Sequence, residues 1–90
     1  MEPGKIQSSI LKWVSDNYMA TGEIRQNVCD DLGRAISDEA FYGALFGLFF
    51  TSLVTSHIYD SQNAAFASIL SPDEYNPDVL YWRVAEDAGG

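Results

Sequence analysis

Residues 37–54 read SDEAFYGALFGLFFTSLV, and this stretch determines the predicted fold. Ser37 is a favourable helix N-cap, and Asp38 and Glu39 place negative charge in the first turn, where the helix dipole is positive. The residues that follow are apolar on nearly every side, which is unusual for a helix at a protein surface. We therefore predict a helix that runs to about Val54. Because both of its faces are apolar, the face that does not pack in the core must also be covered.

Two shorter helices are predicted upstream of this stretch. Large apolar residues recur at three- and four-residue spacing over residues 6–18, as on one face of a helix. They are Ile6, Ile10, Leu11, Trp13, Val14 and Tyr18. Apolar residues at every fourth position from 24 to 32 predict a second helix over about residues 22–32, with Thr21 as its N-cap and Gly33 as its stop.

Two strands are predicted in the C-terminal half. Residues 55–59 and 79–84 are rich in β-branched and aromatic side chains, and we expect them to pair as an antiparallel ribbon. The connection at 60–78 is too long for a tight hairpin, and residues 63–70 within it are expected to form a helical turn. The chain of 90 residues is expected to form one domain (1–90), with a core of about residues 6–84 and a flexible tail at 85–90.

Three helices before a two-stranded ribbon are the element order of a winged helix-turn-helix domain. The run from Ser37 to Leu48 resembles the recognition helix of bacterial winged-helix regulators of the PadR and MarR type. In those families a polar cap opens the helix, an aromatic residue and two leucines face the core, and a Leu-Val pair leads into the wing. The matching residues are Tyr42, Leu45, Leu48, Leu53 and Val54, and residues 81–84 look like the returning wing strand. The resemblance implies an α+β, mostly α, three-helix winged helix-turn-helix-like domain with a two-stranded C-terminal wing.

The charge pattern departs from that of the DNA-binding members of these families. Thirteen Asp and Glu oppose five Lys and Arg, which gives a net charge of -8 and a surface that repels phosphate. The connection at 60–78 carries four carboxylates and no Lys or Arg. The outward positions of the third helix carry no cation or amide to hold phosphates or read bases. These positions are Asp38, Glu39, Gly43, Phe46, Gly47, Phe50 and Thr51. We therefore predict that the chain does not bind nucleic acid directly.

The same seven outward positions are predicted to bind a partner. Gly43, Gly47 and Thr51 recur every four residues, a stripe of small side chains along which another backbone could approach. Phe46 and Phe50 flank the stripe, and aromatic residues dominate interface hot spots. We expect a protein partner, or a second copy of the chain in a homodimer, to dock here. Phe46→Asp and Phe50→Asp are expected to keep the fold and abolish this association.

The sequence leaves one alternative open for the outer face of the third helix. The 60–78 connection contains Phe66, Ile69 and Leu70, which could fold back over the third helix and bury its outer face within the monomer. Small proteins seldom expose a large contiguous apolar patch.

No catalytic, cofactor-binding or metal-binding residue is predicted. His57 is the single histidine, and the sequence leaves open whether a serine or Cys29 lies near it as a nucleophile. No calcium loop or phosphate-binding loop is present in the sequence. Cys29 is the single cysteine, so neither an intrachain disulfide nor a Cys-based zinc site can form. The N-terminus lacks the apolar run of a secretory signal, and we expect a cytoplasmic protein. The expected function is a non-enzymatic protein-binding module without a cofactor, either an adaptor or an inhibitor, such as a phage-type acidic inhibitor of a host nucleic-acid-binding machine.

Two other functional classes remain open at this stage. The first is a winged-helix DNA-binding transcriptional regulator whose cations converge on one surface after folding; these are Lys5, Lys12, Arg25, Arg34 and Arg83. The second is a small single-span membrane protein, because residues 40–59 are uncharged and long enough to cross a bilayer. Interior polar residues and acidic flanks argue against a span, so no membrane contact is expected.

Overall fold

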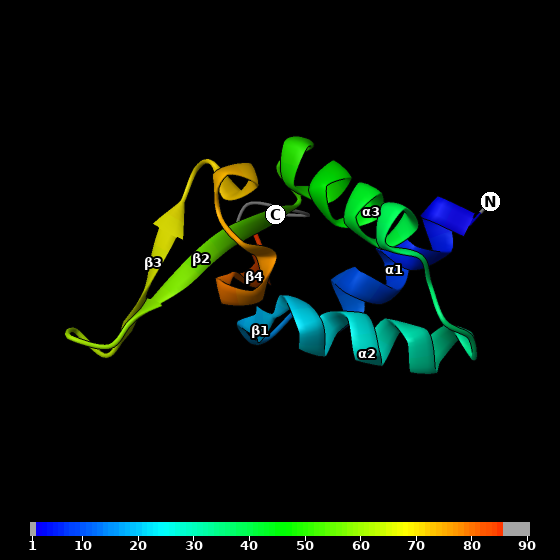
Figure 1. Cartoon of the computed structure of the whole chain (residues 1–90), viewed down its shortest axis with the longest axis horizontal. Helices are drawn as coiled ribbons and strands as arrows, with labels where there is room; N and C mark the ends of the chain where they lie inside the picture. The colour runs from blue at the N-terminus through cyan, green and yellow to red at the C-terminus, as the bar shows by residue number, and fades with distance from the viewer. Residues whose placement is uncertain (1, 86–90) are drawn as a thin grey trace.

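The computed structural model describes residues 2–85, which form three helices and a four-stranded antiparallel sheet. The helices pack together at one end, and the sheet extends from the other (Figure 1). The elements are α1 (Glu2–Trp13), β1 (Met19–Ala20), α2 (Thr21–Leu32), α3 (Asp38–Phe50), β2 (Val54–Asp60), β3 (Ala65–Ile69), the 3-10 turns η1 (Pro72–Glu74) and η2 (Pro77–Val79), and β4 (Tyr81–Val84). The α+β class is therefore confirmed, while most of the tail expected at 85–90 lies outside the described residues.

The first helix is shorter than its apolar spacing predicted. α1 ends at Trp13, and the carbonyl of Val14 accepts a 3.0 Å hydrogen bond from the backbone N–H of Val84. This bond holds the chain beside β4 instead of continuing the helix. Tyr18, which was expected on the helix, lies against the sheet and stacks on Phe66, with ring centroids 4.0 Å apart.

The second helix has the predicted range, but its N-cap differs from the predicted residue. Gly33 ends α2 in the left-handed conformation (φ 70°), as expected for a glycine stop. The N-cap is Ala20, so the prediction of Thr21 is wrong. The Thr21 hydroxyl is buried, donates to the carbonyl of Leu80 at 3.3 Å and accepts from Nε1 of Trp82 at 2.7 Å. The Thr21 hydroxyl therefore connects the start of α2 to β4.

The third helix begins as predicted and ends earlier. The Ser37 hydroxyl accepts from the backbone N–H of Ala40 at 3.1 Å, which confirms the cap. α3 ends at Phe50, because Ser52 takes a left-handed conformation (φ 64°) and Val54 begins β2. The inner face of α3 is fully packed in the core. Its buried residues are Phe41, Ala44, Leu45 and Leu48.

The sheet has the order β1-β4-β2-β3, so the predicted two-stranded ribbon is part of a larger sheet. β2 and β4 pair antiparallel as predicted, with Val54 opposite Val84. The expected helical turn at 63–70 is wrong, because Ala65–Ile69 forms β3 and pairs with β2. The Asp60 carboxylate accepts from the backbone N–H of Gln62 at 3.0 Å and fixes the turn between them. β3 therefore pairs the backbone groups on one of its sides with β2, a tertiary interaction that helix propensity alone cannot predict.

Alternate residues of the sheet face opposite sides. One side packs on the helices and contributes Val54 and Trp82 to the buried core. The other side, which we call the outer sheet face, carries a second cluster of mainly aromatic side chains in mutual contact. Its members are Tyr18, His57, Tyr59, Phe66, Tyr81 and Arg83.

Candidate functional site

Three aromatic residues at four-residue spacing form a row along one side of α3. The ring centroids of Tyr42 and Phe46 lie 6.5 Å apart, and those of Phe46 and Phe50 lie 6.4 Å apart. Phe46 also meets the buried Trp82 edge to face at 5.6 Å. Phe50, one turn further, is 70% exposed. The row therefore begins against the core and ends in solvent.

The segment that carries η1 and η2 lies beside this row and forms a second wall. Between the two walls is a groove of about 330 Å³, which we call the aromatic groove. It is lined by Tyr42, Phe46, Phe50, Asp73, Tyr75 and Pro77. Tyr75 is 40% exposed, and Asp73 is the one charged residue among these lining residues. The groove thus combines an apolar floor with a carboxylate at its edge.

Short-range hydrogen bonds shape the second wall. A proline begins each 3-10 turn, where its fixed φ is favourable and its missing N–H costs nothing. The backbone N–H of Tyr75 donates to the carbonyl of Pro72 at 3.1 Å, and the Asn76 side chain accepts from the N–H of Asp78 at 2.9 Å. Pro72 is buried, so the wall is anchored to the protein body.

The 60–78 connection approaches α3, but it does not cover the outer face of this helix with Phe66, Ile69 and Leu70. Phe66 lies on the outer sheet face, and Ile69 pairs with Ser56 inside the sheet. Leu70 is 88% exposed. Residues 73–77 line the groove instead and leave Phe50 accessible.

The small-residue stripe of α3 is occupied in part by the chain itself. A methyl group added at Gly47 would lie 3.1 Å from Nε2 of Gln7, which donates to the carbonyl of Ala44 at 3.2 Å. Gly47 therefore permits α1 to approach α3. Gly43 has no neighbour within 4 Å of such a methyl group, and the Thr51 hydroxyl donates to the carbonyl of Gly47 at 2.9 Å.

The two acidic site residues lie at the opposite end of α3 from Phe50. Asp38 and Glu39 are both exposed in the first turn, and Asp38 forms an ion pair with Arg25. Nη2 of Arg25 also donates to the carbonyl of Ile36 at 2.6 Å, which braces the loop between α2 and α3. A helix of 13 residues is about 18 Å long between its first and last Cα atoms. The seven predicted residues therefore do not form one compact site.

Phe46 and Phe50 are the two predicted site residues that line the aromatic groove. The other lining residues were not predicted as site residues. The spacing of Tyr42 with Phe46 and Phe50 is a signal that could have added Tyr42. The second wall has no such signal, because its position depends on how the connection folds.

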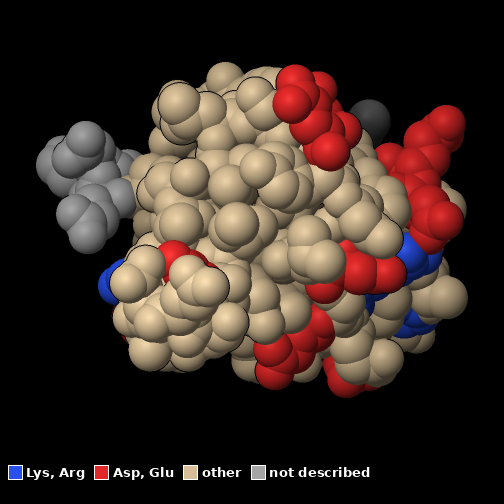
Figure 2. All heavy atoms as spheres, turned by 60° about the vertical axis from the view of Figure 1, so that its left-hand side comes forward, with Lys and Arg blue, Asp and Glu red and all other residues tan. Residues whose placement is uncertain are grey.

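Charge on the protein surface is mostly negative and scattered. Figure 2 shows a face that is largely uncharged, with acidic groups in several separate places and the few visible lysine or arginine groups at its edges. Lys5 and Lys12 belong to α1, Arg25 to α2 and Arg83 to β4, while Arg34 lies in the loop between α2 and α3. The helix that the resemblance would assign to DNA recognition carries none of the five cations.

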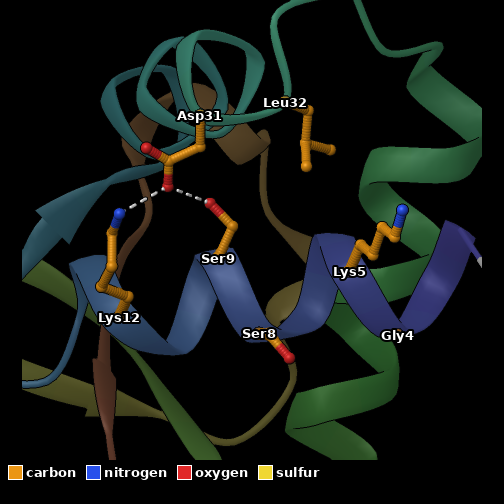
Figure 3. A pocket seen from close by; sticks show the side chains of 7 residues that line it. All are labelled: Gly4, Lys5, Ser8, Ser9, Lys12, Asp31 and Leu32. Carbon is orange, nitrogen blue, oxygen red and sulfur yellow. Dashed lines mark hydrogen bonds and ion pairs between the residues drawn. The ribbon is translucent and has the colours of Figure 1, made fainter.

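A second, open pocket lies between α1 and α2 (Figure 3). Asp31 accepts from the Ser9 hydroxyl at 2.7 Å and from Nε1 of Trp13 at 3.0 Å, and it pairs with Lys12 at 2.9 Å. These interactions, those of Ser9 and Lys12 first, lower the pKa of Asp31 from 3.8 to about 2. Lys5 lies at the other end of the pocket and points away from Asp31. The carboxylate therefore links α1 and α2.

Compared with protein-family models, curated proteins and solved structures, the chain matches none. Within residues 2–85, no helix has the length and apolarity that a bilayer crossing requires. The function is therefore inferred from the chain's own surface.

Proposed function

We propose that this chain is a non-enzymatic protein-binding module with a winged-helix-like fold, an adaptor or an inhibitor, whose aromatic groove receives a basic, amphipathic segment of another protein. The observation that carries the proposal is Phe50, 70% exposed at the open end of a groove with aromatic walls. Exposed aromatic side chains set beside an apolar pocket are the usual anchors of protein interfaces.

The fold assignment is supported by the order of the elements. Three helices precede the antiparallel pair β2 and β4, and β1 pairs with β4 on its other side. In this interpretation α3 holds the position of a recognition helix, and β3 is an added strand at the edge of the sheet. The groove then lies between the recognition helix and the connection that returns to the wing.

The charge of the chain supports a basic partner. Asp73 lines the groove, and the protein has a net charge of -8. A cationic segment would be attracted to this surface over the range of the Debye length, and its apolar side chains would supply affinity once docked. A second copy of the chain would bring two strongly negative surfaces together, which disfavours the homodimer relative to a basic partner.

A nucleic-acid-binding machine that this chain inhibits is one form of such a basic partner. Such machines present cationic surfaces that normally hold phosphates. An acidic module could occupy such a surface through its carboxylates while Phe50 enters an apolar site nearby.

The test compares partner capture by the wild-type chain, Phe50→Asp and Leu70→Asp. Both variants replace an exposed apolar side chain with the same charge, but Leu70 lies outside the groove. We expect Phe50→Asp to lose a protein that the wild type and Leu70→Asp both capture from a lysate of the native cells. Equal capture by the two variants, or tight binding of the wild type to duplex DNA at low salt, would contradict the proposal.

A further inference from the structure

A separate cavity on the outer sheet face has a different chemistry from the rest of this acidic protein. It has a volume of about 330 Å³ and lies where β2, β3 and β4 run side by side next to the residues before β1. Its polar lining residues are Tyr18, Thr55, His57, Ser68 and Arg83. Among residues 2–85, no lining residue carries a carboxylate.

The sheet register brings these side chains together. His57 on β2 lies opposite Ser68 on β3 and opposite Tyr81 on β4, and Thr55 lies opposite Arg83. Directly opposed residues in an antiparallel sheet project from the same face, with Cβ atoms about 5 Å apart. An imidazole, two hydroxyl groups and a guanidinium group therefore converge on one side of the sheet.

His57 is buried, with 6% of its surface exposed, and one of its ring nitrogens has no partner. Nε2 lies 2.7 Å from the Thr55 hydroxyl, which is also 3.3 Å from the carbonyl of Arg83. Nδ1 is buried and makes no hydrogen bond within the described part of the chain. Buried polar atoms are nearly always hydrogen-bonded, and the ring of His57 lines the cavity, so the missing partner of Nδ1 points to a ligand.

Either tautomer of His57 prepares this atom for a negatively charged group. If the Thr55 hydroxyl donates to Nε2, the proton of neutral His57 is on Nδ1 and lacks an acceptor. If the Thr55 hydroxyl donates to the carbonyl of Arg83, Nδ1 is a bare acceptor that becomes a donor when the ring is protonated. An oxyanion beside Nδ1 completes the hydrogen bonding in both cases.

Arg83 supplies the positive charge of the cavity. Its guanidinium group lies over the ring of Tyr18, with 5.2 Å between Cζ and the ring centroid, and no carboxylate of residues 2–85 forms an ion pair with it. Stacking on an aromatic ring leaves the N–H groups of Arg free to bind an anion in bidentate fashion.

From this geometry we infer that the cavity binds a small oxyanion, a phosphate or carboxylate group, held by Arg83, Nδ1–H of His57 and the Ser68 hydroxyl. This site is distinct from the aromatic groove and does not depend on the function proposed for it. In the free protein, burial and then the charge of Arg83 lower the pKa of His57. Of the described groups around the ring, Tyr18, Tyr81, Ser68 and Thr55 have no carboxylate, so the bound anion is the group that raises this pKa.

The test uses the ring signal of His57, which is unambiguous because the chain has one histidine. Inorganic phosphate is titrated into the labelled protein at constant ionic strength, with sodium chloride as the reference and acetate as a second arm. We expect a saturable shift of the His57 signal and a higher His57 pKa with phosphate. Competition by acetate would identify a general oxyanion site, and its absence would identify a site for phosphate groups.

Matched variants identify the cavity as the origin of the shift. Arg83→Gln is expected to weaken phosphate binding by about tenfold or more, as for a lost charged hydrogen bond, and Ser68→Ala by about threefold. Lys5→Gln changes the net charge equally but lies in the other pocket, and it should bind like the wild type. If Arg83→Gln does not fold, Arg83→Lys and Ser68→Ala provide the test. The inference is overturned if phosphate moves the signal no more than chloride does, or if the cavity variants bind phosphate as tightly as Lys5→Gln.

Discussion

The ring of Phe46 meets the buried ring of Trp82 edge to face, with 5.6 Å between their centroids. This contact connects the floor of the aromatic groove to the core of the protein. Phe50, the next aromatic residue along the same side of α3, is 70% exposed. Phe46 and Phe50 lie one turn apart on the same side of α3 but have different roles. Phe46 packs against the core, whereas Phe50 lies at the surface.

The first prediction concerns this pair. Phe46→Asp should lower the free energy of unfolding by about 3 kcal/mol or more, because it places an unpaired carboxylate against Trp82. Phe50→Asp should change it by less than about 1 kcal/mol, because the side chain is mostly in solvent. Urea unfolding followed by tryptophan fluorescence measures both. The structure thus leads us to expect a large loss of stability from Phe46→Asp alone. Equal losses from the two variants would show that Phe50 also belongs to the core.

The second prediction concerns the hydrogen bond from Nε1 of Trp82 to the hydroxyl of Thr21. Thr21→Val keeps the shape of the side chain but leaves a buried N–H without an acceptor, so it should lower the unfolding free energy by about 1–3 kcal/mol. Thr21→Ser retains the hydroxyl and should lose less. Thermal and urea unfolding of the three proteins measure the difference. A Thr21→Val variant as stable as Thr21→Ser would mean that this bond contributes little.

The third prediction separates the two glycines of α3. Gly43→Ala should stabilise the protein by about 0.5–1 kcal/mol, because alanine favours the helix and the added methyl group meets nothing within 4 Å. Gly47→Ala should gain less or lose stability, because its methyl group would lie 3.1 Å from Nε2 of Gln7. Denaturant midpoints compare the two directly. Equal gains at both positions would show that Gly47 is not needed for the approach of α1.

The fourth prediction concerns acid stability. The pKa of Asp31 falls from 3.8 to about 2 on folding, chiefly through the Ser9 hydroxyl and Lys12. A carboxylate with a lowered pKa stabilises the fold fully above pH 3.8, and this contribution disappears as the pH falls towards 2. The wild type should therefore lose more stability across this range than Asp31→Asn.

Asp30→Asn is the matched control for this pH dependence, since it removes the neighbouring charge and leaves the links of Asp31 to α1 intact. Chemical unfolding at several pH values gives the three profiles. If both variants follow the wild-type profile, Asp31 does not carry the acid dependence.

Much of the helical part of the fold could be predicted from local sequence. The Ser37 cap, the Gly33 stop and the apolar spacing of α2 are short-range signals that the structure confirms. α1 was predicted too long, because the bond from the N–H of Val84 to the carbonyl of Val14 is a tertiary interaction that spacing cannot reveal. Local signals thus locate helices better than they locate helix ends.

The strands and the candidate site depended more on tertiary contacts. A helical turn was expected at residues 63–70, but pairing with β2 decides the conformation of β3. Phe50 was correctly placed at a surface, whereas its neighbour Tyr75 comes from a connection whose path the sequence did not predict. The cavity around His57 was missed for a similar reason, because only the sheet register brings His57, Ser68 and Arg83 together.

The most direct test of the aromatic groove as a binding site is photo-crosslinking in the native cells. Benzoylphenylalanine is placed at position 50 in one protein and at position 70 in another, since both side chains are exposed and only the first lines the groove. We predict a discrete adduct with a different, basic protein from position 50 and none from position 70. Adducts of the same kind from both positions, or an adduct from position 70 alone, would contradict the account.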